Sequence, residues 1–234
     1  PEAKCALLRQ AGADWVVLAA ADRDLLSMTA EAFIEEVLLR RLAVRHVVEG
    51  RDFFFGRGRA GTVETLRRAG ERLGFACRLV EPVVMDLPEG PQRVSSTLIR
   101  GLLAGGRVED ARRCLGRDYT MYGPVVAGRG HGRKIGFPTA NVDPGQQAVP
   151  ADGVYAGWAE FEGARTPAAI SVGDRPTLGG GGRAVEAHLL GVAGELYGRR
   201  MTLGFVARLR EQKKFDGDEP LRRQIEKDLD RVRQ

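Results

Sequence analysis

A glycine-rich segment at residues 128–141, with the sequence GRGHGRKIGFPTAN, combines residue types that bind nucleotide phosphates. Glycines let the backbone come close to a ligand, and their N–H groups can face phosphate oxygens. Arg133 and Lys134 add positive charge, and Phe137 with Pro138 stiffens the chain that follows. From the spacing alone, a glycine-rich hairpin without a ligand remains the alternative. The candidate glycines are Gly128, Gly130, Gly132 and Gly136.

Two polar side chains, Thr139 and Asn141, end this segment. In an extended chain, residues two apart point to the same face. A hydroxyl and an amide oxygen are hard ligands that suit Mg²⁺, an ion that keeps several waters and shares substrate phosphates with its site. The pair therefore indicates a Mg²⁺ site beside a nucleotide. The segment is not a Walker A loop, because GxxxxGK[ST] occurs nowhere in the chain.

A carboxylate in an apolar run is the candidate base. Glu186 lies in AVEAHLL, where most neighbours are apolar, so it is either paired, on a solvated face, or poised to accept a proton. His188 shares its face in a strand, and we expect a structural role for this histidine.

Two segments of the first half could bind an anion or a ring. A predicted helix starts with two serines and a threonine and carries an arginine one turn on, which suits an anion at its N-terminus or an ordinary N-cap. These residues are Ser95, Ser96, Thr97 and Arg100. Residues 52–61, DFFFGRGRAG, combine aromatic rings with arginines and predict either a stacking and phosphate site or a hydrophobic cluster under a loop.

The composition excludes several classes of protein. With 43% hydrophobic and 29% charged residues, the 234-residue chain is typical of globular proteins. Residues 1–117 carry 19 basic and 16 acidic side chains, and residues 118–234 carry 17 and 15, so the net charge of +5 divides evenly into +3 and +2. We therefore expect no nucleic-acid partner. Three widely spaced cysteines and the lack of a long apolar run predict a cytoplasmic protein without a membrane partner.

The first half is predicted to consist of alternating strands and helices, which would position its candidate binding residues. Strands are predicted at residues 15–20, 46–48 and 75–80. Helices are predicted at residues 2–10, 30–42, 95–104 and 108–115, and between Thr62 and Gly74, with Thr29 and Thr62 as N-caps. This order predicts a parallel sheet with crossover helices. Because the chain opens on a helix, we expect a further strand–loop–helix unit upstream.

The second half is predicted to form a small all-β domain. It holds 19 of the 31 glycines, and short β-type runs recur between turn signals. The strands are predicted at residues 119–127, 154–161, 167–172, 185–190 and 200–209. An amphipathic helix follows Pro220, with an apolar stripe of Leu221, Ile225, Leu229 and Val232. Five or six antiparallel strands indicate a barrel or sandwich, and we predict domains at 1–116 and 117–234.

Together these motifs resemble the bacterial bifunctional riboflavin kinase/FMN adenylyltransferase family, often called FAD synthetases. GRGHGRKIGFPTAN is similar to the flavokinase signature of that family. Further motifs follow in the family's order: ADGVYAG (151–157), VGDRPTLGG (172–180), VEAHLL (185–190), ELYGRR (195–200) and ARLREQKKF (207–215). The resemblance implies an incomplete Rossmann-like α/β nucleotidyltransferase domain followed by a six-stranded flavokinase barrel with a C-terminal helix.

The resemblance also implies roles for residues. Thr139 and Asn141 would bind Mg²⁺ with the phosphates of ATP, and the glycine loop would cover the nucleotide. Glu186 would accept the proton of the ribityl 5′-hydroxyl of riboflavin, and Arg210 with nearby residues would help hold riboflavin or its product FMN. In the first half, SSTLIR is similar to the family's nucleotide motif, so Ser95, Ser96, Thr97 and Arg100 would contact ATP.

One departure concerns the second activity of the family. The family begins with a GNFDGVHLGH-like strand, whose His-x-Gly-His part is central to adenylyl transfer. This chain has only His46, His131 and His188, and none of them forms that pattern. We therefore expect a riboflavin kinase that forms little or no FAD. The alternatives are a full FAD synthetase with its upstream segment restored, and a flavin- or nucleotide-binding protein without turnover.

Overall fold

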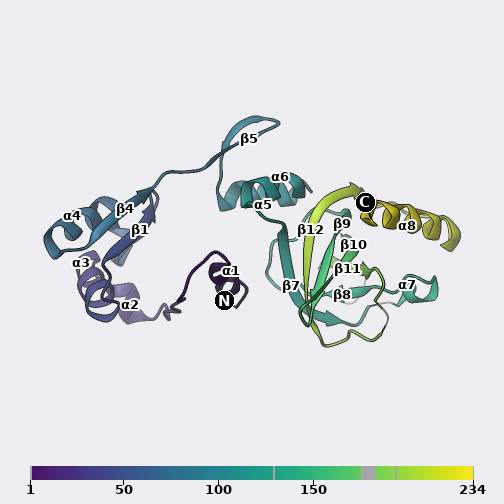
Figure 1. The fold of residues 1–234 in the computed structure, drawn as a ribbon, viewed down its shortest axis with the longest axis horizontal. Helices are drawn as coiled ribbons and strands as arrows, with labels where there is room; N and C mark the ends of the chain where they lie inside the picture. Colours follow the sequence, from purple (N-terminus) through teal and green to yellow (C-terminus); the bar gives the residue numbers. More distant parts are fainter. Residues whose placement is uncertain (1, 129, 175–182, 193, 234) are drawn as a thin grey trace. The chain divides into compact units, whose positions relative to one another are not determined.

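The computed structural model describes residues 2–128, 130–174, 183–192 and 194–233 (Figure 1). Its contacts divide the chain into two units, Pro1–Val84 and Met85–Gln234. Helices α5 (Ser96–Ala104) and α6 (Val108–Leu115) share their core with the barrel strands that follow, so both belong to the second unit. The boundary between residues 116 and 117 remains a prediction from the sequence.

The first unit is a small α/β structure. Its elements are α1 (Glu2–Gln10), α2 (Arg23–Ser27), α3 (Ala30–Ala32), the π-helix η1 (Phe33–Arg41), β1 (His46–Gly50), β2 (Phe54–Phe55), the 3₁₀-helix η2 (Arg57–Arg59), β3 (Gly61–Thr62), α4 (Val63–Leu73) and β4 (Ala76–Val80). Strands β1 and β4 pair in parallel, with α4 between them in the chain. Side chains of η1, α4 and the β2 hairpin, Ile34, Leu66 and Phe55, form the core.

Polar residues at the predicted positions begin these helices. Thr29 accepts a hydrogen bond from Ala32 N, and Thr62 accepts one from Thr65 N while Thr65 bonds back to Thr62 N. These bonds satisfy N–H groups that have no partner within the first turn of a helix. The predicted caps at Thr29 and Thr62 are confirmed.

The prediction of a buried strand at residues 15–20 is wrong. The structure has no strand there, and Trp15 is 89% exposed. Among the residues described, the parallel sheet of this unit has two strands rather than three. A short apolar run cannot form a strand by itself, because it needs a neighbouring strand to hydrogen-bond its backbone.

The second unit is a closed six-stranded antiparallel barrel with helices on its outside. The strand pair β5 (Val84–Leu87) and β6 (Gly90–Arg93) precedes α5 and α6. The barrel strands are β7 (Tyr119–Val126), β8 (Ala140–Val142), β9 (Gly153–Phe161), β10 (Ala164–Asp174), β11 (Arg183–Leu189) and β12 (Arg200–Arg210), in the spatial order β10-β11-β8-β7-β12-β9. The short helix α7 (His131–Lys134) lies in the glycine-rich segment, and α8 (Asp218–Arg233) ends the chain.

Alternation along the strands explains why the barrel forms. Val185, Ala187 and Leu189 of β11 are buried in the barrel core, whereas Glu186 and His188 lie on the opposite face of the same strand. Large side chains from other strands, such as Tyr155 and Phe205, fill the interior. The predicted barrel is confirmed, and the strand that carries Glu186 presents it on the outer surface.

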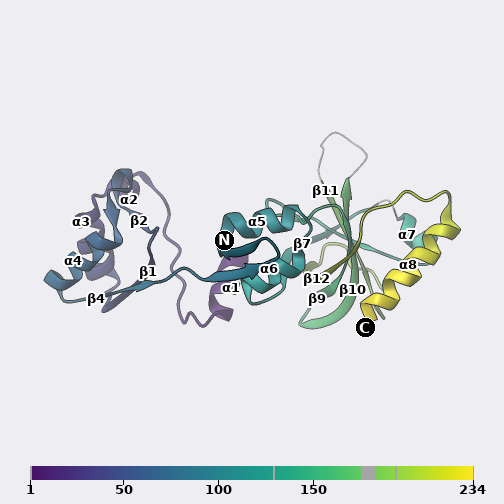
Figure 2. The ribbon, with the colours of Figure 1, turned by 90° about the horizontal axis from the view of Figure 1, so that it is seen from above.

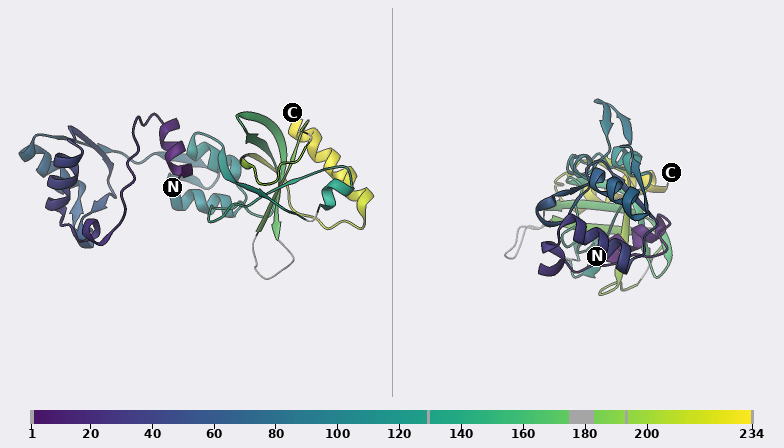
Figure 3. Two further views of the ribbon diagram at one scale, coloured as in Figure 1. Left: turned by 90° about the horizontal axis from the view of Figure 1, so that it is seen from below. Right: turned by 90° about the vertical axis from the view of Figure 1, so that its left-hand side faces the viewer.

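The helices of this unit cover different sides of the barrel. Helix α6 packs on β7 and β12, and α8 packs on β9 and β10 (Figures 2 and 3). Figures 1 and 2 place α5 and α6 on one side of the barrel and α8 with α7 on the other. Within the described part of the chain, no helix combines the length and apolarity needed to cross a bilayer.

Candidate active site

A row of polar side chains crosses three strands on the outside of the barrel. Glu186 of β11 pairs in register with Asn141 of β8 and with Ser171 of β10. Directly opposite residues of neighbouring strands present their side chains on the same face. Thr139 lies just before β8, and its Oγ1 donates to Glu186 Oε2 over 3.2 Å. Three residues singled out from the sequence, Thr139, Asn141 and Glu186, are thus brought together.

Close packing against the glycine-rich segment fixes Asn141. The residue is only 8% exposed, which is unusual for an amide side chain. A Cβ atom added at Gly128 would lie 2.1 Å from Asn141 Nδ2, so a larger residue at this position would force the Asn141 side chain to shift. The glycine at 128 therefore leaves room for the Asn141 side chain.

The rest of this segment folds into the short turn of α7. Phe137 N donates to Gly132 O over 2.8 Å, and a Cβ at Gly132 would lie 2.4 Å from Phe137 O. His188 Nδ1 donates to Pro138 O over 2.8 Å, and the rings of His188 and Phe137 meet edge to face. These contacts hold the residues before Thr139 against β11, and they give His188 a structural partner.

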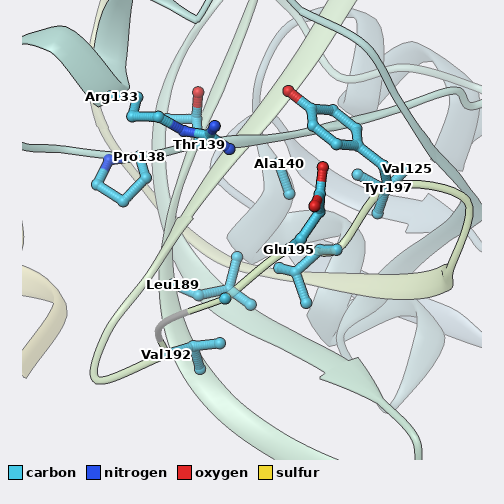
Figure 4. A pocket seen from close by; sticks show the side chains of 11 residues that line it. Val125, Arg133, Pro138, Thr139, Ala140, Leu189, Val192, Glu195 and Tyr197 are labelled. Atoms are coloured by element: carbon cyan, nitrogen blue, oxygen red, sulfur yellow. The ribbon is translucent and has the colours of Figure 1, made fainter.

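One cavity opens between the glycine-rich segment and the loop before β12. This cavity, called the Tyr197 cavity here, has a volume of about 420 Å³. Figure 4 shows the polar ends of Arg133, Thr139, Glu195 and Tyr197 around its upper part, with apolar side chains such as Leu189 below them. It can therefore take a ligand with both an apolar portion and anionic groups.

A second, larger cavity lies between the polar row and α8. This cavity, called the α8 cavity here, has a volume of about 670 Å³. Its apolar lining includes Phe137, Phe215, Leu221 and Ile225, and its polar lining includes Lys134, Glu186, Arg210 and Gln212. Apolar walls with a few polar groups are typical of sites for flat organic ligands.

Thr139 is the point at which the two cavities meet, because it lines both of them. Two described cations of the glycine-rich segment line different cavities: Arg133 lines the Tyr197 cavity and Lys134 lines the α8 cavity. Glu186 lines the α8 cavity. A group held in one cavity can thus meet a group held in the other at the Thr139–Glu186 pair.

The other residues singled out from the sequence have different surroundings. Gly130, Gly132 and Phe137 line the α8 cavity and Pro138 lines the Tyr197 cavity, whereas Gly128 and Gly136 line neither. Ser95 caps α5 by accepting a hydrogen bond from Leu98 N, and Arg100 donates to the Thr97 hydroxyl. Ser95, Ser96, Thr97 and Arg100 line neither cavity. Most of the VGDRPTLGG motif, residues 175–180, lies outside the described residues.

Some lining residues were not singled out from the sequence. Glu195 and Tyr197 belong to the ELYGRR motif, for which the sequence predicts no role. Asp228 is not among the residues that the sequence indicates. A signal for Asp228 exists, since it lies seven residues after Leu221 and three after Ile225 and so interrupts the apolar stripe of the C-terminal helix with a charge.

The polar row fits a magnesium ion better than a metal held wholly by protein. No group of three or more His, Cys, Asp or Glu side chains with metal-binding geometry occurs in the described ranges. Mg²⁺ typically takes only one or two protein ligands and completes its shell with water and phosphate oxygens. The Thr139 hydroxyl donates its proton to Glu186, which leaves the lone pairs of Oγ1 for a cation.

Comparisons with known proteins agree on both halves of the chain. The family model for riboflavin kinase, Flavokinase, matches residues 115–234, and the family model for FAD synthetase, FAD_syn, matches residues 1–98. A bifunctional riboflavin kinase/FMN adenylyltransferase from Pseudomonas fluorescens is 38% identical over 97% of this chain and 74% of its own length. The protein of the same description from Escherichia coli K12 is 36% identical over 96% of this chain and 71% of its own length.

A solved structure also matches the whole chain. A crystal structure described as that of a macrolide-efflux protein from Streptococcus pneumoniae matches with a TM-score of 0.84 and 28% sequence identity. The match covers 100% of this chain and 74% of the other.

Proposed function

The chain belongs to the bifunctional riboflavin kinase/FMN adenylyltransferase family and carries a riboflavin kinase domain, and we propose that the Thr139–Glu186 pair is the centre of its kinase reaction. The enzyme transfers the γ-phosphate of ATP to riboflavin, which yields FMN for flavin biosynthesis. The observation that carries the assignment is that Thr139 lies where the two cavities meet and holds Glu186 by a hydrogen bond.

The chemistry of the cavities supports a different substrate for each. Riboflavin occupies the α8 cavity, because its ring system needs a large apolar space and its ribityl chain then reaches Glu186. ATP occupies the Tyr197 cavity, where Arg133 faces the phosphates. The γ-phosphate and the 5′-hydroxyl then meet beside Thr139.

Glu186 acts as the general base of the reaction. One carboxylate oxygen accepts the hydrogen bond of Thr139, which fixes the orientation of the group. The other carboxylate oxygen accepts the proton of the ribityl 5′-hydroxyl as the hydroxyl oxygen attacks the γ-phosphorus. The bond from the γ-phosphorus to the bridging oxygen of ADP breaks, and ADP leaves. Asn141 and Thr139 would hold a magnesium ion, which would supply positive charge to the transferring phosphoryl group. Most of the catalysis then comes from positioning and electrostatics, as phosphoryl transfer requires.

A direct assay tests this function against its non-catalytic alternative. The full chain is incubated with riboflavin, ATP and Mg²⁺, and the products are separated by chromatography. We expect stoichiometric FMN and ADP, with no FMN when ATP or Mg²⁺ is omitted. Binding of riboflavin without any FMN would instead identify a flavin-binding protein and overturn the kinase assignment.

A further inference from the structure

Asp228 is a buried charge on the apolar face of α8. It lies three residues after Ile225 and one before Leu229, and the residue is 3% exposed. A carboxylate so far from water is costly unless it is paired and hydrogen-bonded. The contacts of Asp228 with its neighbours therefore decide what it does.

The partner of Asp228 is Arg210, the last residue of β12. Arg210 Nη2 donates to Asp228 Oδ2 over 2.7 Å and Nε donates to the same carboxylate over 3.0 Å, with the two side chains 14% and 4% exposed. Gln224 Nε2, one turn earlier on α8, donates to Asp228 Oδ1 over 2.9 Å. A two-point contact of this kind fixes the plane of the guanidinium group.

The pair still leaves Arg210 able to bind a ligand. Nε and one N–H of Nη2 face Asp228, and one N–H of Nη1 donates to Glu211 O over 3.0 Å. Three of the five guanidinium N–H groups therefore have acceptors within the described residues, which leaves two for the α8 cavity that Arg210 lines. Phe215 lies under the group, with its ring centre 5.8 Å from Arg210 Cζ.

We propose that Asp228 is a positioning residue for flavin recognition, acting by holding the guanidinium group of Arg210 in the wall of the α8 cavity. The acceptor oxygens of the flavin are the ligand of the two remaining N–H groups. This proposal rests on the proposed function, in which the α8 cavity holds riboflavin. Because Asp228 acts on one cavity only, its loss should affect riboflavin and not ATP.

The substitution Asp228→Asn tests this role in the full chain. It keeps the size of the side chain but removes the charge that orients Arg210. We expect the KM for riboflavin and its Kd, measured by quenching of flavin fluorescence, to rise about tenfold, equivalent to about 1.4 kcal/mol. The KM for ATP and kcat should change less than about twofold.

A matched control is available on the same helix. Asp230 pairs with Arg233 over 2.8 Å, but both side chains are more than half exposed. The same change at this position, Asp230→Asn, should leave both KM values unchanged, since exposed ion pairs contribute little. Equal rises in both KM values for Asp228→Asn, or no rise in the riboflavin values, would overturn the proposal.

A second variant and a double variant separate positioning from simple loss of stability. If Asp228→Asn does not unfold cooperatively, Gln224→Met is measured instead; it removes one hydrogen bond to Asp228, and a riboflavin-only rise of two- to threefold is expected. The double variant Arg210→Lys, Asp228→Asn should bind riboflavin within about twofold of Arg210→Lys alone, because Asp228 acts through Arg210. If the two substitutions weaken riboflavin binding independently, so that their effects multiply in the double variant, the proposal is contradicted. It is also contradicted if Gln224→Met shows no riboflavin-specific change.

The kinase assignment and this inference fail in different ways. If the unaltered chain forms no FMN, the proposed function fails, and the riboflavin Kd values of the variants still decide the role of Asp228. If the chain forms FMN but the variants bind riboflavin like the unaltered protein, only the inference fails.

Discussion

The hydroxyl group of Thr139 has two tasks in the candidate site. It donates its proton to Glu186, and its lone pairs remain available to a cation. This arrangement explains why a threonine, rather than a second carboxylate, suits the position. A carboxylate in its place would repel the charge of Glu186 and, when ionised, could not donate a hydrogen bond to it.

The substitution Thr139→Val tests the hydroxyl alone, because valine has nearly the same shape. A hydrogen bond to a charged group contributes about 1.5–3 kcal/mol, so kcat/KM should fall about 10- to 100-fold. Thr139→Ser keeps the hydroxyl and should remain within about fivefold of the unaltered enzyme. Steady-state FMN formation measures both, and equal losses in the two variants would show that the hydroxyl is not what matters.

Magnesium titrations test the ligand assignment of the polar row. Thr139→Ala and Asn141→Ala each remove one oxygen that the proposed ion uses, so the Mg²⁺ concentration for half-maximal activity should rise several-fold in both. The measurement is the rate of FMN formation at a fixed ATP concentration and increasing Mg²⁺ concentrations. An unchanged magnesium requirement in both variants would contradict the assignment.

The candidate site residues could be predicted from the sequence where their spacing alone determines which face of a strand they share. Thr139 and Asn141 share a face in any extended chain, and Glu186 stands out as a carboxylate among apolar residues. The register that sets Glu186 opposite Asn141 could not be predicted, because strand pairing depends on how the whole barrel closes. The pairing of Arg210 with Asp228 is a similar case, since it joins two elements that meet only in the folded unit.

The glycine-rich segment positions Asn141 by close contact rather than by flexibility. The substitution Gly128→Ala places a methyl group 2.1 Å from the Asn141 amide, so that side chain must move out of the polar row. We expect kcat/KM to fall at least tenfold with the barrel still folded, as judged by thermal unfolding. Gly101→Ala on α5 is the control, because nothing lies within 4 Å of the new methyl and helix propensity should raise stability by about 0.5–1 kcal/mol. Full activity of Gly128→Ala would contradict this account.

The barrel should lose stability above pH 10 through a partly buried tyrosine. Burial raises the pKa of Tyr119 to about 12 from its ordinary value of 10, and its hydroxyl donates to Ala148 O over 2.6 Å. The native state therefore keeps a proton that the unfolded chain releases, so this contribution is complete below pH 10 and is lost between pH 10 and 12.

Urea unfolding at pH 9 and pH 11 measures this effect. Tyr119→Phe has no proton to release, so its unfolding free energy should fall less between the two pH values than that of the unaltered chain. Burial also raises the pKa of Tyr155, so part of the fall should remain in the variant. An equal fall in both proteins would contradict the role of Tyr119.

Elements with a local signal were predicted well, and elements without one were not. Caps at Thr29 and Thr62 begin helices as expected, since one hydrogen bond to the backbone defines the first turn. Ser95 caps its helix in the same way, which was one of the two roles open to it from the sequence. The run at residues 15–20 has strand composition but is exposed, because a strand exists only beside a partner. The π-helical turns of η1 were not predicted either, since no single residue type marks that geometry.

The proposed kinase site is contained within one of the two units of the molecule. All residues of the polar row and of both cavities belong to Met85–Gln234. Helices α5 and α6 belong to the same unit, so the barrel core extends to residues before 117, such as Leu103 and Val108. Sequence patterns distinguish the helical segments from the β-strands of the second half. They do not predict that α6 packs on β7 and β12, because that packing depends on tertiary contacts.

Hydrogen exchange tests whether riboflavin acts on this unit alone. At a riboflavin concentration 100-fold above Kd, the second unit should gain about 2.7 kcal/mol of stability. Amides of β8, β11 and α8 that exchange by unfolding should slow about 100-fold, whereas those of β1 and β4 should change less than twofold. Mass spectrometry of peptides reports both, and equal slowing in β1 and β4 would contradict a site confined to the second unit.

The central claim is that Glu186 is the base of a phosphoryl transfer, and single-turnover FMN formation by Glu186→Gln tests it most directly. With the enzyme in excess over riboflavin and with saturating Mg²⁺ and ATP, we predict that the rate falls about 10²–10⁴-fold while riboflavin still binds. Glu160→Gln, which removes an exposed carboxylate paired with Arg165 on the same barrel, should leave the rate unchanged. A fall of less than about threefold in Glu186→Gln would contradict the claim.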